Sequence, residues 1–458
     1  MRRNTWGSVA AADLVFIICT ACDAPQPTAP ARAAPDVRVA SLTSPSDLVR
    51  QLAAERGMVP LPPTPYVRPA LSRLGQALAF DKILSGTRDI SCMTCHLPAF
   101  ATGDGKSLSI GQGGIGLGPP RTHPGVVFIP RNAPPLFNMS ALRHLFWDGR
   151  VELDAHGDVH TPASSQLTPE MTRVFEFGAA SALPLFPVTS RDEMRGYGGN
   201  ELAAIHDGDF TAIWDGIMKR LGAIPEYRGM FEAAYPGTKF SDMTFAHASN
   251  AIAGFIVDRL SFNDTPWDRF LGGRDDALTP AQLDGAQTFL TLKCSLCHNG
   301  STFSDEQFHD VAVPQIGPGE GDGALGRDDF GRMRVTGEAN DRYRFRTSPL
   351  RNVELTGPYG HDGAIVSLRA FVDHYGESET RLLDYDPSQL EPALQGTLLG
   401  TTTAILAQRD TLLEGVVLSP AVAEKLMQYL SALTDDRARN LSRLVPARVP
   451  SGLPVDRP

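Results

Sequence analysis

The chain has 458 residues and a formal net charge of −10, with 42% hydrophobic and 21% charged residues. This length allows two or three domains with cores of their own, and the composition is ordinary for a soluble globular protein. The excess of acidic residues argues against nucleic acid as a partner and favours a cationic one, although a solvated acidic surface explains the same charge.

Residues 1–22 are typical of an export leader. Two arginines precede a short, interrupted apolar run at residues 14–18, which is too short to span a membrane. Residues 20–22 resemble the end of a bacterial lipoprotein box, in which Cys22 would carry a lipid anchor. We therefore expect a periplasmic protein, with the leader either removed or kept as a membrane anchor.

Two Pro-containing segments flank the rest of the chain. Residues 23–45 are rich in Pro, Ala and Thr and predict a disordered linker, and residues 441–458 form a similar polar tail. Between them the same order of elements occurs twice: an amphipathic helix, a Cys-x-x-Cys-His pentapeptide and a long Gly- and Pro-rich loop. A Gly-Gly pair at residues 272–273 marks the expected boundary between domains 46–272 and 273–440.

The first repeat begins with apolar residues at helical spacing over residues 71–80, which predict a helix. Cys92, Cys95 and His96 belong to the pentapeptide that follows. A Gly- and Pro-rich loop then covers residues 111–125.

The second repeat has a clearer helix start. Thr279 is the expected N-cap, Pro280 takes the first helical position and Gln282 completes a capping box. The second pentapeptide follows this helix, and a glycine-rich loop at residues 314–326 comes after it. The cysteines and the histidine of this pentapeptide are Cys294, Cys297 and His298.

Each pentapeptide is the attachment signature of a c-type haem, in which the cysteines form thioethers to the porphyrin and the histidine binds the iron. A zinc site would need four clustered ligands, and a redox dithiol would not need a histidine after the second cysteine in both places. We therefore predict two covalently bound c-type haems. The expected fold is mainly α, with two cytochrome c-like haem domains packed together and long irregular loops that wrap the haems.

Two haems on one chain are compatible with electron transfer alone. An enzyme needs, in addition, an open position on one iron and an acid–base group beside it. The motifs outside the two pentapeptides therefore decide between a carrier and an enzyme.

Four further stretches resemble the bacterial dihaem cytochrome c peroxidases and their relative MauG. They are Pro-Arg-Asn-Ala-Pro at 130–134, Phe-Trp-Asp-Gly-Arg at 146–150, Leu-Arg-Asn-Val at 350–353 and Thr-Gly-Pro-Tyr-Gly-His-Asp-Gly at 356–363. The resemblance covers residues 70–435, both haem motifs included, in the order of the family. It implies reduction of hydrogen peroxide to water at the N-terminal haem, with electrons relayed through the C-terminal haem. It also implies a small electron-donor protein, either a cytochrome c or a cupredoxin, and a homodimer.

The resemblance makes the haem on Cys92 and Cys95 the peroxidatic one, with His96 as its proximal ligand. Many family peroxidases carry a distal histidine where this sequence has Gln112. Because glutamine is a poor ligand of haem iron, we expect this iron to keep an open position. His123 is the one nearby alternative.

The resemblance also assigns the acid–base group to Glu193, which precedes Met194. This carboxylate would move a proton from one oxygen of the peroxide to the other, so that water leaves. Two alternatives stay open. Ser190 and Glu193 have the spacing of a helix capping box, and Glu170 is a competing match because a methionine follows it as well.

Two further roles follow from the same resemblance. Trp147 would lie between the haems and relay electrons, although core packing is the commoner fate of a tryptophan. Asn132 and the main-chain carbonyls of Thr356 and Pro358 match a calcium site between the haems, and oxygen ligands suit such a cation. Alternatively, Asn132 is only a turn residue.

The distal ligand of the second haem is expected to be Tyr375, which lies nineteen residues after Thr356, where family peroxidases have a methionine and MauG has a tyrosine. The sequence places this tyrosine on a buried helix stripe at i, i+3, i+4 and i+7: Leu368, Phe371, Val372 and Tyr375. His374 and Met333 are the alternatives. An anionic phenolate would lower the potential of this haem, whereas a thioether would raise it.

Three functions are compatible with these observations. The first is a dihaem c-type peroxidase that reduces hydrogen peroxide. The second is a MauG-like dihaem oxidase that uses peroxide equivalents to modify a protein or a small molecule. The third is a non-catalytic dihaem electron-transfer protein, which the expected open face of the first haem argues against.

Overall fold

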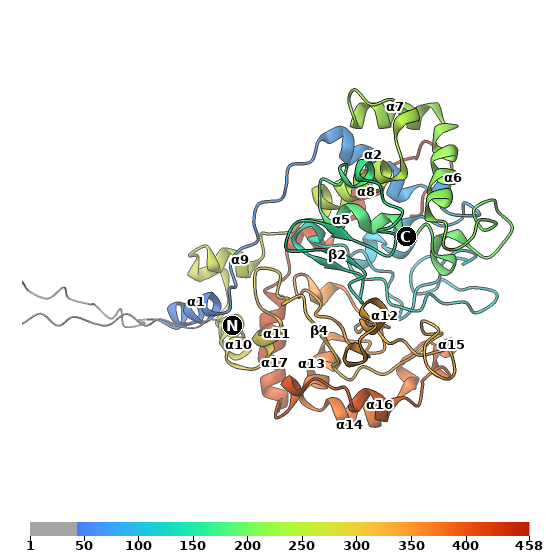
Figure 1. Cartoon of the computed structure of the whole chain (residues 1–458). Coiled ribbons are helices and arrows are strands. Elements are labelled where there is room, and N and C mark those ends of the chain that lie inside the picture. Colours follow the sequence, from blue (N-terminus) through green and yellow to red (C-terminus); the bar gives the residue numbers. More distant parts are fainter. Residues whose placement is uncertain (1–43, 458) are drawn as a thin grey trace, which may run out of the picture. The chain divides into compact units, whose positions relative to one another are not determined.

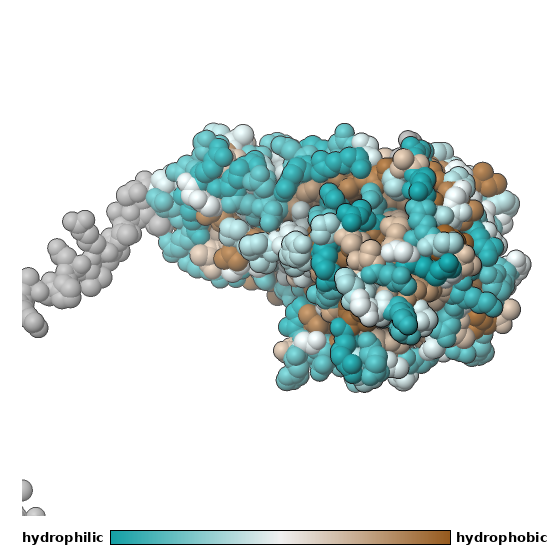
Figure 2. Space-filling model, turned by 90° about the horizontal axis from the view of Figure 1, so that it is seen from above, coloured by the Kyte–Doolittle hydropathy of each residue, from teal (hydrophilic) through white to brown (hydrophobic). Residues whose placement is uncertain are grey.

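The structure, a computed structural model, describes residues 44–457. The expected leader and the expected linker up to residue 43 lie outside the described residues. Helices make up 43% of the structure and strands 5%, which confirms the prediction of a mainly α fold. Within residues 44–457 no helix has the length and apolar character needed to cross a membrane. Hydrophilic residues predominate on the face drawn in Figure 2, and the hydrophobic ones occur in small groups.

The helices and strands are short and are joined by long loops (Figure 1). The helices up to the expected boundary are α1 (Pro45–Glu55), α2 (Pro69–Phe80), α3 (Cys92–Cys95), α4 (Pro169–Thr172), α5 (Ala179–Ala182), α6 (Phe210–Gly222), α7 (Pro225–Ala234), α8 (Phe245–Leu260) and α9 (Pro266–Leu271). The helices beyond it are α10 (Pro280–Thr291), α11 (Cys294–Cys297), α12 (Met333–Thr336), α13 (Leu368–Gly376), α14 (Ser378–Leu383), α15 (Pro392–Gln395), α16 (Thr402–Leu406) and α17 (Pro420–Ser431).

The strands form two small antiparallel sheets. One contains β1 (His144–Leu145), β2 (Val151–Leu153) and β3 (Val159–His160) in this order, and the other pairs β4 (Phe308–His309) with β5 (Phe345–Arg346). The strands are too short to carry a core, so the hydrophobic cores lie between helices.

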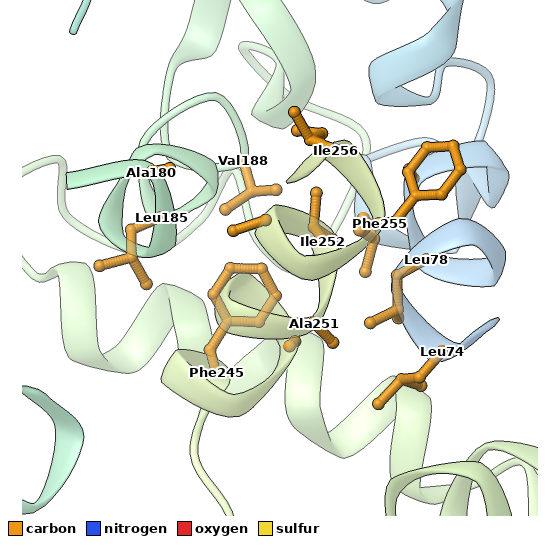
Figure 3. Close-up of a cluster of buried hydrophobic side chains, with 14 of the residues drawn as sticks. Leu74, Leu78, Ala180, Leu185, Val188, Phe245, Ala251, Ile252, Phe255 and Ile256 are labelled. Carbon is orange, nitrogen blue, oxygen red and sulfur yellow. The ribbon is translucent and has the colours of Figure 1, made fainter. Parts of the chain in front are cut away.

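The first core is built around the crossing of α2 and α8. Leu74 and Leu78 of α2 pack beside Ala251 and Phe255 of α8 (Figure 3). Gly75 lies at the point of closest approach, where a Cβ atom would stand 1.8 Å from the carbonyl oxygen of Ala251. The absence of a side chain therefore sets the distance between these two helices.

The second core repeats this arrangement with α10 and α17. Gly285 of α10 lies at the crossing, where a Cβ atom would stand 2.1 Å from the carbonyl oxygen of Lys425. Trp267 of α9 packs on Tyr429 of α17, with 5.1 Å between the ring centroids. The N-cap of α10 is Thr279 with its capping box, as the sequence predicts. Each half of the chain thus uses a glycine at the crossing of two helices beside its haem motif.

Each end of the described residues 44–457 packs against the core of the opposite half. Val49 and Ala53 of α1 belong to the second core. Residues 441–457, expected as a polar tail, pack against the first core through Leu444 and Val449, and Lys82 pairs with Asp456 at 2.6 Å. The C-terminus lies among the elements of the first core (Figure 1). In α1, Val49, Leu52 and Ala53 have the i, i+3, i+4 spacing of an apolar helix face. The apolar residues of 441–457 are too widely spaced for a helical or strand pattern to reveal their burial.

The change from one core to the other lies before the Gly-Gly pair. Phe262 belongs to the first core, whereas Trp267 and Phe270 belong to the second. Helix α9 therefore belongs to the C-terminal half, because its buried residues pack in the second core.

A buried ion cluster joins the two halves. Arg131 is 7% exposed and donates to both carboxylate oxygens of Asp329 at 2.6 and 2.8 Å. Its remaining Nη1 donates to Asp148 at 2.6 Å. The backbone N–H of Asn132 donates to the carbonyl of His361 at 2.8 Å. Residues 131–132 of the first half are thereby fixed to the second half.

We expect Gly75→Ala and Gly285→Ala each to destabilise the protein by about 2–3 kcal/mol, because the new methyl group meets a backbone oxygen that cannot rotate away. Gly229→Ala in α7 is the matched control, since no atom lies within 4 Å of its added Cβ. This control should raise stability by up to about 1 kcal/mol through helix propensity. Denaturant unfolding of the holoprotein measures all three, and equal effects at the three sites would contradict the packing argument.

Candidate functional site

A cavity of about 670 Å³, here called the first cavity, lies beside the first pentapeptide. Its wall includes Cys92, Cys95 and His96. The Nδ1 atom of His96 lies 2.8 Å from the carbonyl oxygen of Thr102, so Nδ1 carries the proton. The other ring nitrogen, Nε2, is then free to bind a metal, which is the arrangement that orients metal-binding histidines in proteins.

A second cavity lies beside the second pentapeptide and has the same construction. Cys294, Cys297 and His298 line it. The Nδ1 atom of His298 lies 3.0 Å from the carbonyl oxygen of Phe303. Burial lowers the pKa of His298, which keeps the imidazole neutral and able to bind iron. Helix α11 carries both cysteines, as α3 does in the first half, and each histidine directly follows its helix.

The burial and the hydrogen bonds of Arg346 show whether a haem fits between these walls. Its side chain is buried and lines both cavities, and it forms no ion pair with any other residue of 44–457. Its hydrogen bonds, to the carbonyls of Phe146 and Thr347, are long at 3.4 and 3.5 Å. Burial lowers its pKa to about 10. A buried cation without a bonded counter-charge is costly, and the propionate groups of haem would supply that charge. The residues therefore fit two haems.

Trp147 lies where the two cavities approach each other. It lines both, and its indole N–H donates to the carbonyl of Asn132 at 2.9 Å. Asp148, the next residue, is held by Arg131. The indole is therefore fixed in a position between the two predicted haems.

Glu193 lines the first cavity from a π-helical turn, Arg191–Arg195. Burial raises the pKa of its carboxyl, against the opposing charge of Arg150. Only one of the two hydrogen bonds of a capping box is present at this turn. The Ser190 hydroxyl accepts from the Glu193 N–H at 3.3 Å, but the Ser190 N–H donates to the Phe186 carbonyl at 3.1 Å. The carboxylate is therefore not needed to cap this turn.

The competing Glu170 lies elsewhere. It is on the surface, pairs with Arg173 at 3.0 Å and lines neither cavity. Of the two Glu-Met pairs in the sequence, the structure brings only the one at Glu193 to a haem motif.

Gln112 and His123 both lie outside the wall of the first cavity. The backbone N–H of Gln112 donates to the carbonyl of Glu193 at 2.9 Å, and its side chain packs against Gly196. His123 accepts at Nδ1 from the N–H of Gly125 at 2.9 Å. Neither side chain faces His96 across the cavity.

Tyr375 faces His298 across the second cavity. The two ring centroids are 6.5 Å apart and the rings are nearly perpendicular. His374 points elsewhere, because its Nε2 lies 2.7 Å from the carbonyl oxygen of Val311. Met333 does not line this cavity. Of the three candidates, the structure places the phenol opposite the histidine.

Asn132, Thr356 and Pro358 all line the second cavity. The amide nitrogen of Asn132 donates to the carbonyls of Lys106 and Ser107, at 3.0 and 3.1 Å. This orientation leaves the amide oxygen available to another partner. The donor set is made of oxygens, which suits a hard cation such as calcium.

The sequence analysis gave no role to several polar residues of these walls, among them His160, His309 and Arg346. His309 lines the second cavity, and its ring nitrogens lie 2.6 Å from Asp410 and 3.1 Å from Asp305. Burial opposes its charge, whereas hydrogen bonds with Asp305, with the Cys297 thiol and with Asp410 raise its pKa to about 11. His160 lies at the exposed rim of the first cavity. None of the three belongs to a local motif, so no signal in the sequence identifies them.

Comparison with known proteins agrees with this geometry. Residues 69–276 match the model of a family described as di-haem cytochrome c peroxidase. The chain is 28% identical over 318 residues to the methylamine utilization protein MauG of Methylorubrum extorquens, covering 69% of this chain and 71% of that protein. It is 28% identical over 311 residues to the cytochrome c551 peroxidase of Pseudomonas aeruginosa, covering 67% and 71%.

A solved structure shows the same fold. It is described as a MauG-like protein associated with microbial copper homeostasis, and it matches with a TM-score of 0.58 and 24% identity over 84% of this chain and 95% of that one. The sequence matches and the geometry agree on one conclusion. By these matches the chain is similar to the dihaem cytochrome c peroxidases and MauG, and it is a peroxidase-type oxidoreductase with two c-type haems.

Proposed function

We propose that this protein reduces hydrogen peroxide to water in the first cavity, with electrons that enter through the second. The observation that carries this proposal is the position of Glu193, a carboxyl with a raised pKa in the same cavity wall as Cys92 and His96. When bound, the two c-type haems supply iron that binds peroxide in one cavity and exchanges electrons in the other.

Glu193 would carry the proton in this reaction. One peroxide molecule takes up two electrons and two protons and gives two molecules of water. The carboxylate accepts a proton at one peroxide oxygen and donates it to the other, so that the leaving group is water instead of hydroxide. A raised pKa suits both steps, because the group gains and loses a proton more evenly near neutral pH than an exposed glutamate does.

Trp147 would provide the path for electrons between the cavities, because its indole lines both walls. The electron donor would be a small cytochrome c or cupredoxin, and the net charge of −10 favours a donor with a cationic docking face. We further infer a calcium ion at Asn132, Thr356 and Pro358, a periplasmic location with a leader or lipid anchor, and a homodimer.

A second candidate function is a MauG-like oxidase that directs peroxide equivalents to a protein or small-molecule substrate. Tyr375 is the observation that favours it. A phenolate ligand is anionic and stabilises the oxidised state of the second haem, whereas a thioether favours its reduction. Steady-state assays separate the two functions: rapid peroxide turnover with reduced cytochrome c supports the peroxidase, and slow turnover with a long-lived oxidised state supports the oxidase.

Glu193→Gln should lower kcat/KM for peroxide by about 10²- to 10⁴-fold, because the amide cannot accept the proton. In the wild type, kcat/KM should fall as the pH falls through the raised pKa of Glu193, since the carboxylate is the active form. This acidic limb should be absent from the pH profile of the variant, which stopped-flow mixing with peroxide can record.

Glu170→Gln is the matched control for this experiment. It makes the same chemical change in the competing Glu-Met pair, on the surface and away from both cavities. We expect its rate and pH profile to equal those of the wild type. Equal losses in both variants, or no loss in Glu193→Gln, would remove Glu193 from the mechanism.

Tyr375→Met should raise the reduction potential of the second haem, on the order of 100 mV within the range of about 0.8 V that axial ligands span. Tyr375→Phe removes the oxygen without offering a new ligand, so its second haem should become high-spin. Spectroelectrochemical titration and low-temperature EPR measure the two effects. An unchanged potential in the first variant together with an unchanged spin state in the second would show that another residue binds this iron.

The oxidised wild type should give one high-spin and one low-spin EPR signal, because Tyr375 faces the second histidine, whereas Gln112 and His123 both lie outside the wall of the first cavity. Two low-spin signals in every redox state would favour the electron-transfer alternative, since peroxide would then find no free iron position. The full-length holoprotein is the sample for this measurement.

A further inference from the structure

Tyr197 is a strongly exposed aromatic side chain close to the first cavity. It is 69% exposed, and among residues 44–457 the only other tyrosine of comparable exposure is Tyr66, at 82%. The two residues that follow it are Gly198 and Gly199, and no atom lies within 4 Å of the position that a Cβ would take on either of them. With this exposure, and with no side chains on the two residues that follow, the phenol ring is accessible to a molecule too large to enter the cavity.

The phenol of Tyr197 is hydrogen-bonded to a carboxylate that can accept its proton. Its O–H donates to the Oδ1 atom of Asp192 at 2.6 Å. This bond raises the pKa of Tyr197 to about 12, so the resting side chain keeps its proton. The guanidinium of Arg191 lies 5.9 Å from the ring centroid, and Asp207 neutralises it at 2.6 Å. Loss of an electron from a phenol releases its proton, and here a carboxylate is already in place to take it.

Asp192 connects this surface tyrosine to the first cavity. It lines that cavity and directly precedes Glu193 on the same π-helical turn. The path from the cavity wall to the molecular surface therefore runs through one residue and one short hydrogen bond. Tyr66 has no carboxylate bonded to its phenol among the described residues, and it does not line the cavity.

We propose that Tyr197 is a surface oxidation site through which the first cavity oxidises phenolic groups that are attached to macromolecules and cannot enter the cavity. This inference rests on the proposed function, because hydrogen peroxide is the oxidant. It narrows the substrate of the second candidate function to phenolic groups on a macromolecule and names the surface residue at which they would be oxidised.

The electrons and protons balance in two equal steps. In each step one electron leaves the Tyr197 phenol for the peroxide in the first cavity and its proton moves to the carboxylate of Asp192, which leaves a neutral phenoxyl radical. Asp192 then passes this proton on to the peroxide oxygens in the cavity, so that its carboxylate is free for the next step. The macromolecular phenol then returns one electron and one proton to Tyr197 and becomes a phenoxyl radical itself. Two such steps reduce one hydrogen peroxide to two waters and oxidise two substrate phenols, which can couple to each other.

Rapid freeze-quench EPR of the holoprotein with peroxide tests the first step. We expect a tyrosyl radical signal in the wild type and in Tyr66→Phe, the matched control, and no such signal in Tyr197→Phe. Asp192→Asn should lower the radical yield by about tenfold or more, because the amide is not a proton acceptor. A wild type without the signal, or a Tyr197→Phe variant that keeps it, would overturn the proposal.

Tyramine coupled to dextran tests the second step, since the polymer keeps the phenol outside the cavity. Tyr197→Phe should lose the peroxide-dependent dityrosine fluorescence of this probe, while Tyr66→Phe keeps it. Both variants should oxidise reduced cytochrome c as fast as the wild type.

Dityrosine formation that persists in Tyr197→Phe, with normal cytochrome c oxidation, refutes the surface site alone. If the wild type consumes no peroxide with any donor, the proposed function fails as well, because Tyr197 then has no source of oxidising equivalents. The two failures are therefore distinguishable.

Discussion

The rest of this structure depends on the ion pairs that the buried guanidinium of Arg131 forms with Asp148 and Asp329. Its three nitrogens bind Asp148 of the first half and Asp329 of the second, and burial in a region of low dielectric makes each partner indispensable. The residues on either side of this cluster are those that matter for function. Asn132 follows Arg131, and Trp147 precedes Asp148, so one ion cluster fixes both the indole and the amide between the two cavities.

The two halves share one plan and differ in what lies opposite the histidine. Each places a histidine after a single-turn helix, fixes its Nδ1 on a backbone carbonyl and packs a glycine at the crossing of two helices. In the second half, a phenol from α13 faces the histidine. In the first half, Gln112 is turned away and hydrogen-bonds through its backbone to Glu193. The presence of Tyr375 opposite one histidine and the outward position of Gln112 in the other half thus distinguish the cavity proposed for electron exchange from the cavity proposed for peroxide reduction.

The charged and titratable side chains of the two cavity walls also differ. Glu193 and Asp192 bring carboxyl groups to the first cavity, His309 lines the second, and Arg346 lines both. Burial raises the pKa of Glu193, and a carboxyl with a raised pKa exchanges protons more readily near neutral pH. The proposed function therefore places proton transfer in the first half and electron entry in the second, with Trp147 in the wall of both cavities. The connection from Asp192 to Tyr197 extends the proton-accepting side of this arrangement to the surface.

Local patterns in the sequence determined the two haem motifs, the mainly helical fold, the capping box of α10 and the placement of Tyr375 on a helix stripe, because each depends on residues only a few positions apart. The family resemblance favoured Glu193 over Glu170, and the tertiary structure brings only Glu193 of the two to a cavity. Tertiary structure alone decided the packing of both ends of residues 44–457 on the opposite core, the crossings at Gly75 and Gly285 and the burial of Arg346. Those features depend on contacts between segments more than a hundred residues apart, for which hydrophobic periodicity within one segment carries no information.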